Sequence, residues 1–397
     1  MEATTAVVLA AGEGTRLRPL TRNRPKPMLP AANRPILEYV LDALVEAGVD
    51  RICLVVGYKR DRVQGHFGPT YRDVPLVYAH QRKQLGSGHA LLQARSVCDG
   101  PVLVVNGDRL LDASAVREVS ETFERHGEPT LAVLEHPETS QYGAVRLRDG
   151  YLDELVEKPD ADEFRFINAG IYAFDADIFD AVEATPRREG ELGLTDTVVR
   201  FLAAGEPVRG VQIGGLWADA TYPWDLLAVA DELFARGRIG EREVAERVWV
   251  AESARVHDEA TLQAPVVVGP DCEVAAGAVV GPNVALGRNA TVGPNVTLVR
   301  SVLDADTRVE AGSVLIDAVA GEDCHLGAST TVPGGPADVR VDDRIFSRQR
   351  LGAVFADRVR AEGDVSCAPG TLVGPEARLG VGVRASGTVE AGAEVRR

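Results

Sequence analysis

Two patterns of apolar residues divide the chain. Up to about Arg236, short continuous apolar runs alternate with stretches whose apolar residues recur three and four positions apart. The continuous runs are typical of strands buried on both faces of a parallel sheet, and the longer stretches are typical of amphipathic helices. This alternation predicts an α/β domain with a Rossmann-like, doubly wound sheet, whose ligands bind at the carboxyl ends of the strands. The expected strands are 5–11, 52–56 and 102–105, and the expected helices are 35–47 and 89–97.

From about Val266 a repeat of six residues replaces the helical pattern. Its register resumes at Ala320 and again at Val373. Such a hexapeptide repeat is typical of an all-β parallel β-helix, in which each short strand contributes one inward aliphatic side chain. A β-sandwich, the alternative, needs alternating strands every 8–12 residues. The first aliphatic positions of the repeat are Val268, Val274, Val280, Leu286, Val292 and Leu298, and glycine follows four of them.

These patterns predict two domains. The first spans residues 1–236, a short linker spans 237–250, and the β-helix spans 251–397. Residues 333–350 break the six-residue repeat, so we expect them to form a loop that projects from the coil.

Charge restricts the partners of the chain. It has 59 acidic and 43 basic residues, for a net charge of -16. Affinity for nucleic acid depends on neutralising phosphates, so a nucleic-acid partner is disfavoured. Only four basic residues are lysines, and a surface rich in Asp, Glu and Arg indicates a salt-rich, halophilic cytoplasm, where screening relieves repulsion. A GC-rich genome, which favours arginine codons, is the alternative explanation.

Other features predict a cytoplasmic protein with no membrane contact. No apolar run approaches the roughly 20 residues that a membrane helix requires, and Met1–Thr4 lack the basic segment that begins a signal peptide. The five cysteines form no CxxC pair. We expect them to be buried apolar side chains in a reducing compartment.

A glycine pair follows the first expected strand. Gly12 and Gly14 lie in the run GEGTRLRPL, which continues to PKPMLP at residues 25–30. Glycines after a buried strand let backbone N–H groups approach phosphate oxygens, and nearby Arg and Lys supply positive charge. The run is not a Rossmann GxGxxG motif, because Leu17 takes the third glycine position, and no GK[ST] follows.

The whole run LAAGEGTRLRPLTRNRPKPMLP resembles the signature of the sugar-1-phosphate nucleotidylyltransferases, also called nucleotide-sugar pyrophosphorylases. Fusion of this transferase to a left-handed β-helix is a family arrangement, so the resemblance covers the whole chain. It implies that Arg16 holds the leaving pyrophosphate and that Lys26 contacts the transferring phosphate. It also implies that the triphosphate is wrapped by Ala11, Gly12, Gly14 and Thr15.

The same resemblance extends to a base-reading motif. The segment QLGSGHA at 84–90 follows Gln81, and in the family a glutamine side chain faces the edge of a pyrimidine. It implies that Gln81 reads the base, that Gly86 lies under it and that Ser87 belongs to the same site. Ser87 as the N-cap of a helix is compatible with this role. We expect UTP or dTTP as the substrate, because a purine would leave buried polar groups unpaired.

Two aspartates follow apolar strands, Asp108 in VLVVNGD and Asp219 in LWAD. Two carboxylates at strand ends can share one Mg²⁺ that also binds substrate phosphates, although many such aspartates only cap turns. The family places its metal aspartates in matching motifs, which implies that Asp108 and Asp219 bind Mg²⁺. The resemblance assigns the sugar phosphate to Gly143, Glu157, Lys158 and Asn168. The resemblance does not decide between glucose-1-phosphate and N-acetylglucosamine-1-phosphate. Enzymes for N-acetylglucosamine usually carry a tyrosine before Gly-Asp, whereas Asn106 precedes and Arg109 follows Gly107-Asp108 here.

The resemblance also bears on the β-helix and on the alternatives for the whole chain. In bifunctional relatives it acetylates glucosamine-1-phosphate with a histidine, a tyrosine and an asparagine, and here Ala311, Val314 and Gly335 occupy those positions. We therefore expect a transferase without acetyl transfer, with the bifunctional enzyme as the alternative. A non-catalytic regulatory subunit is a second alternative, disfavoured because such a scaffold needs neither the basic pair nor the aspartates. The family also implies a homotrimer.

Overall fold

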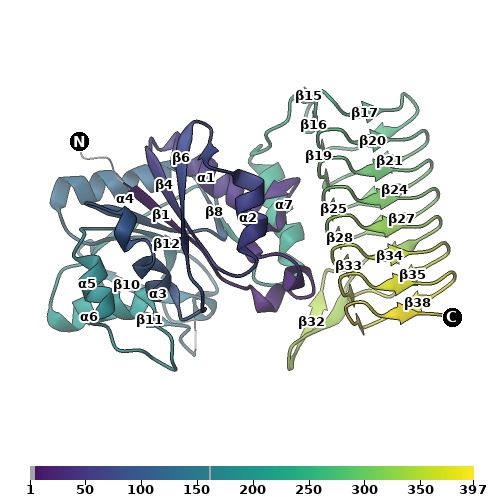
Figure 1. The fold of residues 1–397 in the computed structure, drawn as a ribbon. Helices are drawn as coiled ribbons and strands as arrows, with labels where there is room; N and C mark the ends of the chain where they lie inside the picture. The colour runs from purple at the N-terminus through teal and green to yellow at the C-terminus, as the bar shows by residue number, and fades with distance from the viewer. Residues whose placement is uncertain (1–4, 161) are drawn as a thin grey trace. The chain divides into compact units, whose positions relative to one another are not determined.

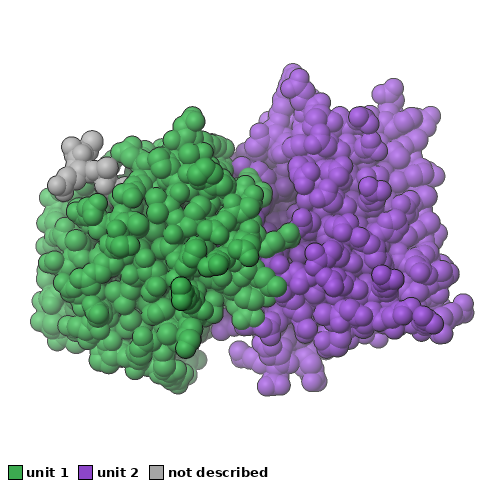
Figure 2. Space-filling model, viewed as in Figure 1, with its two compact units in different colours: residues 1–13, 36–218 green, residues 14–35, 219–397 purple. Residues whose placement is uncertain are grey.

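The computed structural model describes residues 5–160 and 162–397 (Figure 1). They form two compact units, coloured separately in Figure 2. One comprises residues up to Glu13 together with 36–218, and the other comprises 14–35 together with 219–397. We expected the first domain to extend continuously to residue 236. By compactness, 14–35 and 219–236 group with the C-terminal half, and the domain boundaries drawn from the sequence stay a prediction.

The first unit is built on a ten-stranded mixed sheet. Its central strands β1, β4, β6 and β7 are parallel, and β12 runs antiparallel to β7 and β9. β1, β4 and β7 confirm the three strands predicted from the sequence. In sheet order the strands are β10 (Gly143–Arg148), β11 (Tyr151–Glu157), β13 (Arg209–Gln212), β9 (Thr130–Glu135), β12 (Phe166–Phe174), β7 (Val102–Asn106), β1 (Thr5–Ala10), β4 (Arg51–Val56), β6 (Val74–His80) and β5 (Thr70–Tyr71).

Helices flank this sheet. α1 confirms the helix expected at 35–47, whereas the stretch 89–97 is divided between a short helix and a separate 3₁₀ turn at Arg95–Val97. A buried core on the sheet includes Val7, Val55, Val104 and Val182. The helices are α1 (Ile36–Glu46), α2 (Arg60–Phe67), α3 (Ser87–Leu92), α4 (Ala113–His126), α5 (Ile178–Glu183) and α6 (Leu194–Ala204).

The second unit is a coil of short parallel strands that fall in turn into three sheets. Val266 pairs with Val284 eighteen residues later, and Val284 pairs with Ser301 seventeen residues later, so three strands make one coil. This confirms the parallel β-rich architecture expected from the repeat. β15 and β16 lie inside 237–250, the expected linker, and β16 begins the parallel ladder.

The first sheet contains β15 (Glu243–Ala245), β16 (Val248–Val250), β19 (Val266–Val268), β22 (Val284–Leu286), β25 (Ser301–Leu303), β28 (Ala318–Ala320), β33 (Ala353–Phe355), β36 (Thr371–Val373) and β39 (Thr388–Val389). The second contains β17 (Arg255–Val256), β20 (Glu273–Val274), β23 (Thr291–Val292), β26 (Arg308–Val309), β29 (His325–Leu326), β34 (Arg360–Ala361), β37 (Arg378–Leu379) and β40 (Glu394–Val395). The third contains β18 (Thr261–Leu262), β21 (Val279–Val280), β24 (Thr297–Val299), β27 (Val314–Ile316), β30 (Thr331–Pro333), β35 (Ser366–Cys367) and β38 (Arg384–Ala385).

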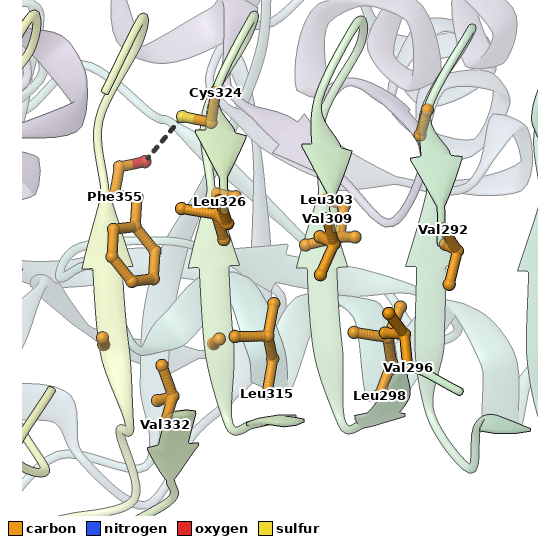
Figure 3. Close-up of a cluster of buried hydrophobic side chains, with 14 of the residues drawn as sticks. Val292, Val296, Leu298, Leu303, Val309, Leu315, Cys324, Leu326, Val332 and Phe355 are labelled. Atoms are coloured by element: carbon orange, nitrogen blue, oxygen red, sulfur yellow. Dashed lines mark hydrogen bonds between the residues drawn. The ribbon is translucent and has the colours of Figure 1, made fainter. Parts of the chain in front are cut away.

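Aliphatic side chains fill the inside of the coil. Figure 3 shows them pointing toward one another from successive strands. The first sheet is buried on its outer side as well, because the central residues of its strands, such as Val267, Val302 and Val354, are fully buried. Helix α7 (Asp225–Ala235) packs on β25 and β28 and on the short strand β2 (Pro30–Ala31), which pairs with β3 (Arg34–Pro35).

The expected loop at 333–350 forms a hairpin of β31 (Ala337–Val341) and β32 (Arg344–Gln349), which leaves the coil in Figure 1. Phe346 of this hairpin contacts the rings of Tyr222 and Trp224, with centroids 4.5 and 5.4 Å away. The insertion therefore packs on the segment that begins α7.

All five cysteines are buried and free, as predicted. Burial raises the pKa of each thiol, to about 12 for Cys324. Across residues 5–160 and 162–397, no helix is long and apolar enough to cross a membrane.

Candidate active site

The carboxyl end of β1 opens into the glycine-rich run. The Ala11 carbonyl accepts hydrogen bonds from the Tyr58 amide at 3.3 Å and from Gln84 Nε2 at 3.4 Å. Gly12 is exposed, and a Cβ added there would meet nothing within 4 Å. Ala11 is thus held by the loops that follow β4 and β6, while the backbone at Gly12 is accessible to a ligand.

Gly14 begins the segment 14–35, which we call the phosphate segment. Its φ of 67° lies in the left-handed region, and an added Cβ would lie 2.8 Å from the Lys26 Cβ. Only glycine fits without strain. The buried Thr21 hydroxyl donates to the Gly14 carbonyl at 2.8 Å, which holds the turn. Thr15 and Arg16 follow on an exposed 3₁₀ turn, where the guanidinium of Arg16 is open to solvent.

Lys26 and Asp219 form the best-defined polar contact of the candidate site. Lys26 Nζ donates to Asp219 Oδ1 at 2.6 Å, and the two side chains are only 12% and 7% exposed. The Thr221 hydroxyl donates to the other oxygen, Oδ2, at 3.2 Å. A lysine and an aspartate 193 residues apart in the chain are therefore brought together.

Asp225 supports the turn after Asp219. Its Oδ2 accepts the amides of Tyr222 at 2.7 Å and Thr221 at 2.9 Å. Burial raises the pKa of Asp225 to about 6, against the effect of these two amides. The residue therefore fixes the chain between Asp219 and α7.

Asp108 lies in the turn between β7 and β8 (Arg109–Leu111), in the first unit. Gly107 before it approaches β1 closely, since an added Cβ would lie 2.9 Å from Val8 Cγ1. β8 pairs with β14 (Trp217–Asp219) in a two-stranded sheet, and Asp219 itself is grouped with the second unit. The part of the chain that the structure describes holds no cluster of three His, Cys, Asp or Glu residues suited to a metal.

Gln81 is buried at the end of β6. Its Nε2 donates to the Gly86 carbonyl at 3.0 Å and lies 3.0 Å from His89 Nδ1. Burial lowers the pKa of His89, and the nearby Arg187 adds to this effect. Gln81 is thus brought to Gly86, and its role in reading a base stays a prediction.

Gly86 and Ser87 contact the loop that precedes α6. Gly86 has a φ of 96°, and an added Cβ would lie 2.5 Å from the Leu192 carbonyl oxygen. Ser87 Oγ accepts the Leu194 amide at 2.9 Å and makes no capping bond, because the N-cap position of α3 is Gly86. Both residues therefore have a packing role.

The four expected sugar residues lie in one region of the first unit. Gly143 pairs with Glu157 across β10 and β11, and a Cβ added to Gly143 would lie 3.1 Å from Glu157 Oε2 and 3.5 Å from Asn168 Cβ. Lys158 has a φ of 47° and is exposed, with Nζ 3.8 Å from Glu157 Oε1. The Asn168 amide is engaged within the protein: Nδ2 donates to Tyr172 Oη at 2.7 Å, and Oδ1 accepts the Gly170 amide at 2.9 Å.

The contacts of an aromatic group beside these residues were not predicted from the sequence. The rings of His136, Tyr142 and Trp217 meet edge to face, and the Arg109 guanidinium lies 5.6 and 5.3 Å from the ring centroids of Tyr142 and Trp217. Arg109 Nη1 also donates to the Asn168 carbonyl at 2.9 Å. No spacing in the sequence links these residues, which come from four separate segments.

Comparison with known proteins gives the class of protein. The model of the nucleotidyl transferase family matches residues 5–235, and that of the GMPPB C-terminal domain matches residues 262–377. The chain is 30% identical to the bifunctional protein GlmU of Methanococcus maripaludis and 32% identical to that of Methanocaldococcus jannaschii. Each match covers 94% of this chain and 93% of the relative.

Two further proteins match somewhat more than half of the chain. The UTP–glucose-1-phosphate uridylyltransferase AglF of Haloferax volcanii is 35% identical over 55% of this chain and 92% of its own length. A crystal structure of UDP-glucose pyrophosphorylase with UDP-glucose is 25% identical, covers 59% of this chain and 99% of that one, and has a TM-score of 0.53. The chain belongs to the nucleotidyl transferase family, among the sugar-1-phosphate nucleotidylyltransferases.

Proposed function

We propose that the chain transfers a nucleotidyl group from UTP or dTTP to glucose-1-phosphate or N-acetylglucosamine-1-phosphate, and releases pyrophosphate. Nucleotidyl transfer to a sugar-1-phosphate is the activity of its family. The observation that carries the residue assignment is the contact of Lys26 with Asp219. The lysine of the PKP run and the aspartate of the WAD run are far apart in the sequence, and the fold pairs them at 2.6 Å.

The proposed reaction is an in-line displacement. An oxygen of the sugar phosphate forms a bond to the α-phosphorus, and the bond from that phosphorus to the bridging oxygen breaks, so pyrophosphate leaves with the electron pair. Such a reaction needs positioned positive charge and no covalent nucleophile. We assign that charge to Lys26, at the transferring phosphate, and to Arg16, which is exposed and can turn toward the leaving pyrophosphate.

We assign Asp108 and Asp219 to Mg²⁺, because both side chains offer carboxylate oxygens. This ion prefers oxygen ligands and is bound by one or two carboxylates together with substrate phosphates, so a cluster of three protein ligands is not required. When bound, Mg²⁺ would neutralise charge on the phosphate oxygens. Lys26 would then hold the Asp219 carboxylate in place from the side.

The remaining predicted residues bind the triphosphate, the base and the sugar phosphate in this proposal. Ala11, Gly12, Gly14 and Thr15 offer backbone N–H groups to the triphosphate, and Gln81 with Gly86 and Ser87 forms the base site. Gly143, Glu157, Lys158 and Asn168 form the sugar-phosphate site. For Asn168 we favour bracing of the sugar site over direct binding of a hydroxyl, because its amide is bonded to Tyr172 and Gly170.

The test is pyrophosphate release over a grid of nucleotides and sugar-1-phosphates. We expect turnover with UTP or dTTP and a hexose-1-phosphate, and none with ATP or GTP. Turnover that prefers a purine would contradict the base assignment. Absence of pyrophosphate with every pair would favour the non-catalytic regulatory subunit.

The bifunctional enzyme is the second candidate, because relatives named bifunctional protein GlmU match nearly the whole chain. A base that takes a proton in acetyl transfer contributes about 10²–10⁴-fold. Ala311, Val314 and Gly335 cannot serve as one. His325 is half-exposed, with Nε2 3.8 Å from Glu310 Oε1. Thiol release from acetyl-CoA with glucosamine-1-phosphate in molar salt should be absent, and release that His325→Ala abolishes would support the bifunctional enzyme.

The coil completes the proposal as an assembly module. We propose that it is a left-handed β-helix and that three chains associate through it. Light scattering at micromolar concentration in high salt tests this, and a monomer there would contradict it.

A further inference from the structure

Arg24 is an almost fully buried arginine in the phosphate segment, two residues before Lys26. Its side chain is 5% exposed. Nη2 donates to Asp357 Oδ1 at 2.8 Å, and Nη1 donates to an Asp304 carboxylate oxygen and to the Met28 carbonyl. A buried charge is tolerated only where it is paired and hydrogen-bonded, so these contacts define one position for the side chain.

Both aspartates belong to corners of the coil. Asp304 follows β25, and Asp357 lies two residues after β33. Asp304 departs from the repeat, because four other coils carry glycine directly after the strand of the first sheet: Gly269, Gly287, Gly321 and Gly374. The repeat is thus interrupted by a carboxylate at the corner that binds Arg24.

The coil between them is shaped around the second carboxylate. The Glu322 amide donates to Asp357 Oδ1 at 3.1 Å, the same oxygen that accepts from Arg24. A Cβ added to Gly321 would lie 2.5 Å from that oxygen. The glycine at position 321 therefore leaves space for the Asp357 carboxylate, and the Glu322 amide orients this carboxylate toward Arg24.

The path from Arg24 to Lys26 is short and stiff. Pro25 and Pro27 flank Lys26, and their rings restrict the backbone on both sides of it. Lys26 then reaches Asp219. A shift of Arg24 is therefore passed to the lysine rather than absorbed by the chain between them.

We propose that Arg24 is a positioning residue, through which Asp304 and Asp357 of the coil place Lys26 for nucleotidyl transfer. The coil would thus take part in the reaction at one defined point, besides any role in assembly. The link to turnover rests on the role of Lys26 in the proposed function.

The test uses the full chain with Asp357→Asn, which keeps the shape and removes one charge, and Arg24→Lys as a second variant should the first not fold. Arg22→Gln is the matched control, since Arg22 lies in the same segment and pairs with Glu390 of the coil at 3.3 Å but is exposed. We expect the kcat of Asp357→Asn to fall about tenfold through misplacement of Lys26, with the KM values little changed. Arg22→Gln should match the wild type.

A second readout does not depend on activity. The chain has four lysines, and Lys59, Lys83 and Lys158 are exposed, whereas Lys26 is mostly buried. Labelling with an amine-reactive acetylating reagent, followed by mass spectrometry, should modify Lys26 slowly in the wild type. It should do so several-fold faster in Asp357→Asn and Arg24→Lys, with the other three lysines unchanged.

The outcomes separate the two proposals. Unchanged Lys26 labelling in folded variants would overturn the positioning role, as would equal acceleration at all four lysines, which reports general loosening. Faster Lys26 labelling with unchanged kcat would support the placement of Lys26 by the coil and contradict its role in turnover. If the wild type releases no pyrophosphate, the proposed function fails, and labelling alone decides the positioning role.

Discussion

The residues assigned to the base and the sugar and those assigned to the phosphates are held in different ways. Gly143 and Glu157 are direct neighbours across two strands, and Gln81 directly follows β6, a third strand of the same sheet. The phosphate segment has only short turns and the two-residue strands β2 and β3. Side-chain contacts hold it instead: Thr21 to Gly14, Lys26 to Asp219, and Arg24 to the coil. Backbone hydrogen bonds of the sheet thus fix the residues for base and sugar, which we call the selective part. Ion pairs and one side-chain hydrogen bond fix the phosphate segment, which we call the cationic part.

The largest effect is expected at the aspartates. Asp219→Asn and Asp108→Asn should each lower turnover on the order of 100-fold or more, because they remove metal-borne stabilisation of the transition state. Steady-state pyrophosphate release with Mg²⁺ measures this, and EDTA should abolish it. The exposed Asp258 in the coil provides the control variant Asp258→Asn. Near-wild-type rates in both site variants would remove the metal assignment.

Lys26→Ala tests the cationic part directly. Its turnover should fall about 100-fold, as when one preorganised donor to a developing charge is removed, and triphosphate affinity should change less. Comparison of kcat with the nucleotide Kd checks this, with Lys83→Ala as the control. If only the KM for nucleotide rises, Lys26 is a binding residue.

Gln81→Ala should weaken recognition of the base and leave kcat little changed. We expect the nucleotide KM to rise about tenfold, since a buried polar edge of the base loses its partner, and the discrimination against purines to weaken. Gln212→Ala, at an exposed position of the same sheet, is the control. A fall in kcat alone would show that the contacts of Gln81 with Gly86 and His89 serve structure only.

Thr21→Val gives the smallest effect and sharpens the account of the phosphate segment. Loss of the hydrogen bond to Gly14 should lower the free energy of unfolding by about 1 kcal/mol, because the substitution keeps the shape of a fully buried side chain. Urea unfolding measures this against Thr261→Val, at an exposed position in β18. An unchanged midpoint would mean that the bond adds nothing to stability.

Patterns of local spacing predicted the fold well. The buried runs gave the correct strands β1, β4 and β7, and the six-residue repeat indicated the parallel coil. Both depend on periodicity within a few residues, which the sequence carries directly. The grouping of 14–35 and 219–236 with the coil has no such signal, because it follows from contacts such as Arg24 with Asp357, 333 residues apart.

The residues of the candidate site were predicted through motifs. The prediction left out residues whose roles depend on contacts between distant parts of the chain. Arg24 lies within the run TRNRPKP, where three basic residues look alike, and only the fold distinguishes the buried Arg24 from the exposed Arg22. Asp304 is visible in the sequence only as a position where the repeat carries an aspartate in place of glycine. For Asn168, the sequence could not reveal the bonds to Tyr172 and Gly170 that occupy its amide.

The burial of the first sheet has a consequence for association between copies. The outer side of the first sheet is already covered by residues of the same chain. A second copy can therefore contact only the outer sides of the second and third sheets. The outward residues of the second sheet include the charged Glu273, Arg308 and Arg378. Molar salt would screen any attraction between these charges and those of a second copy. Those of the third, such as Val279, Thr297 and Val314, are uncharged apart from Arg384 at the last coil. A trimer that survives in molar salt is therefore expected to use the third sheet, and the salt dependence of its dissociation reports which side is in contact.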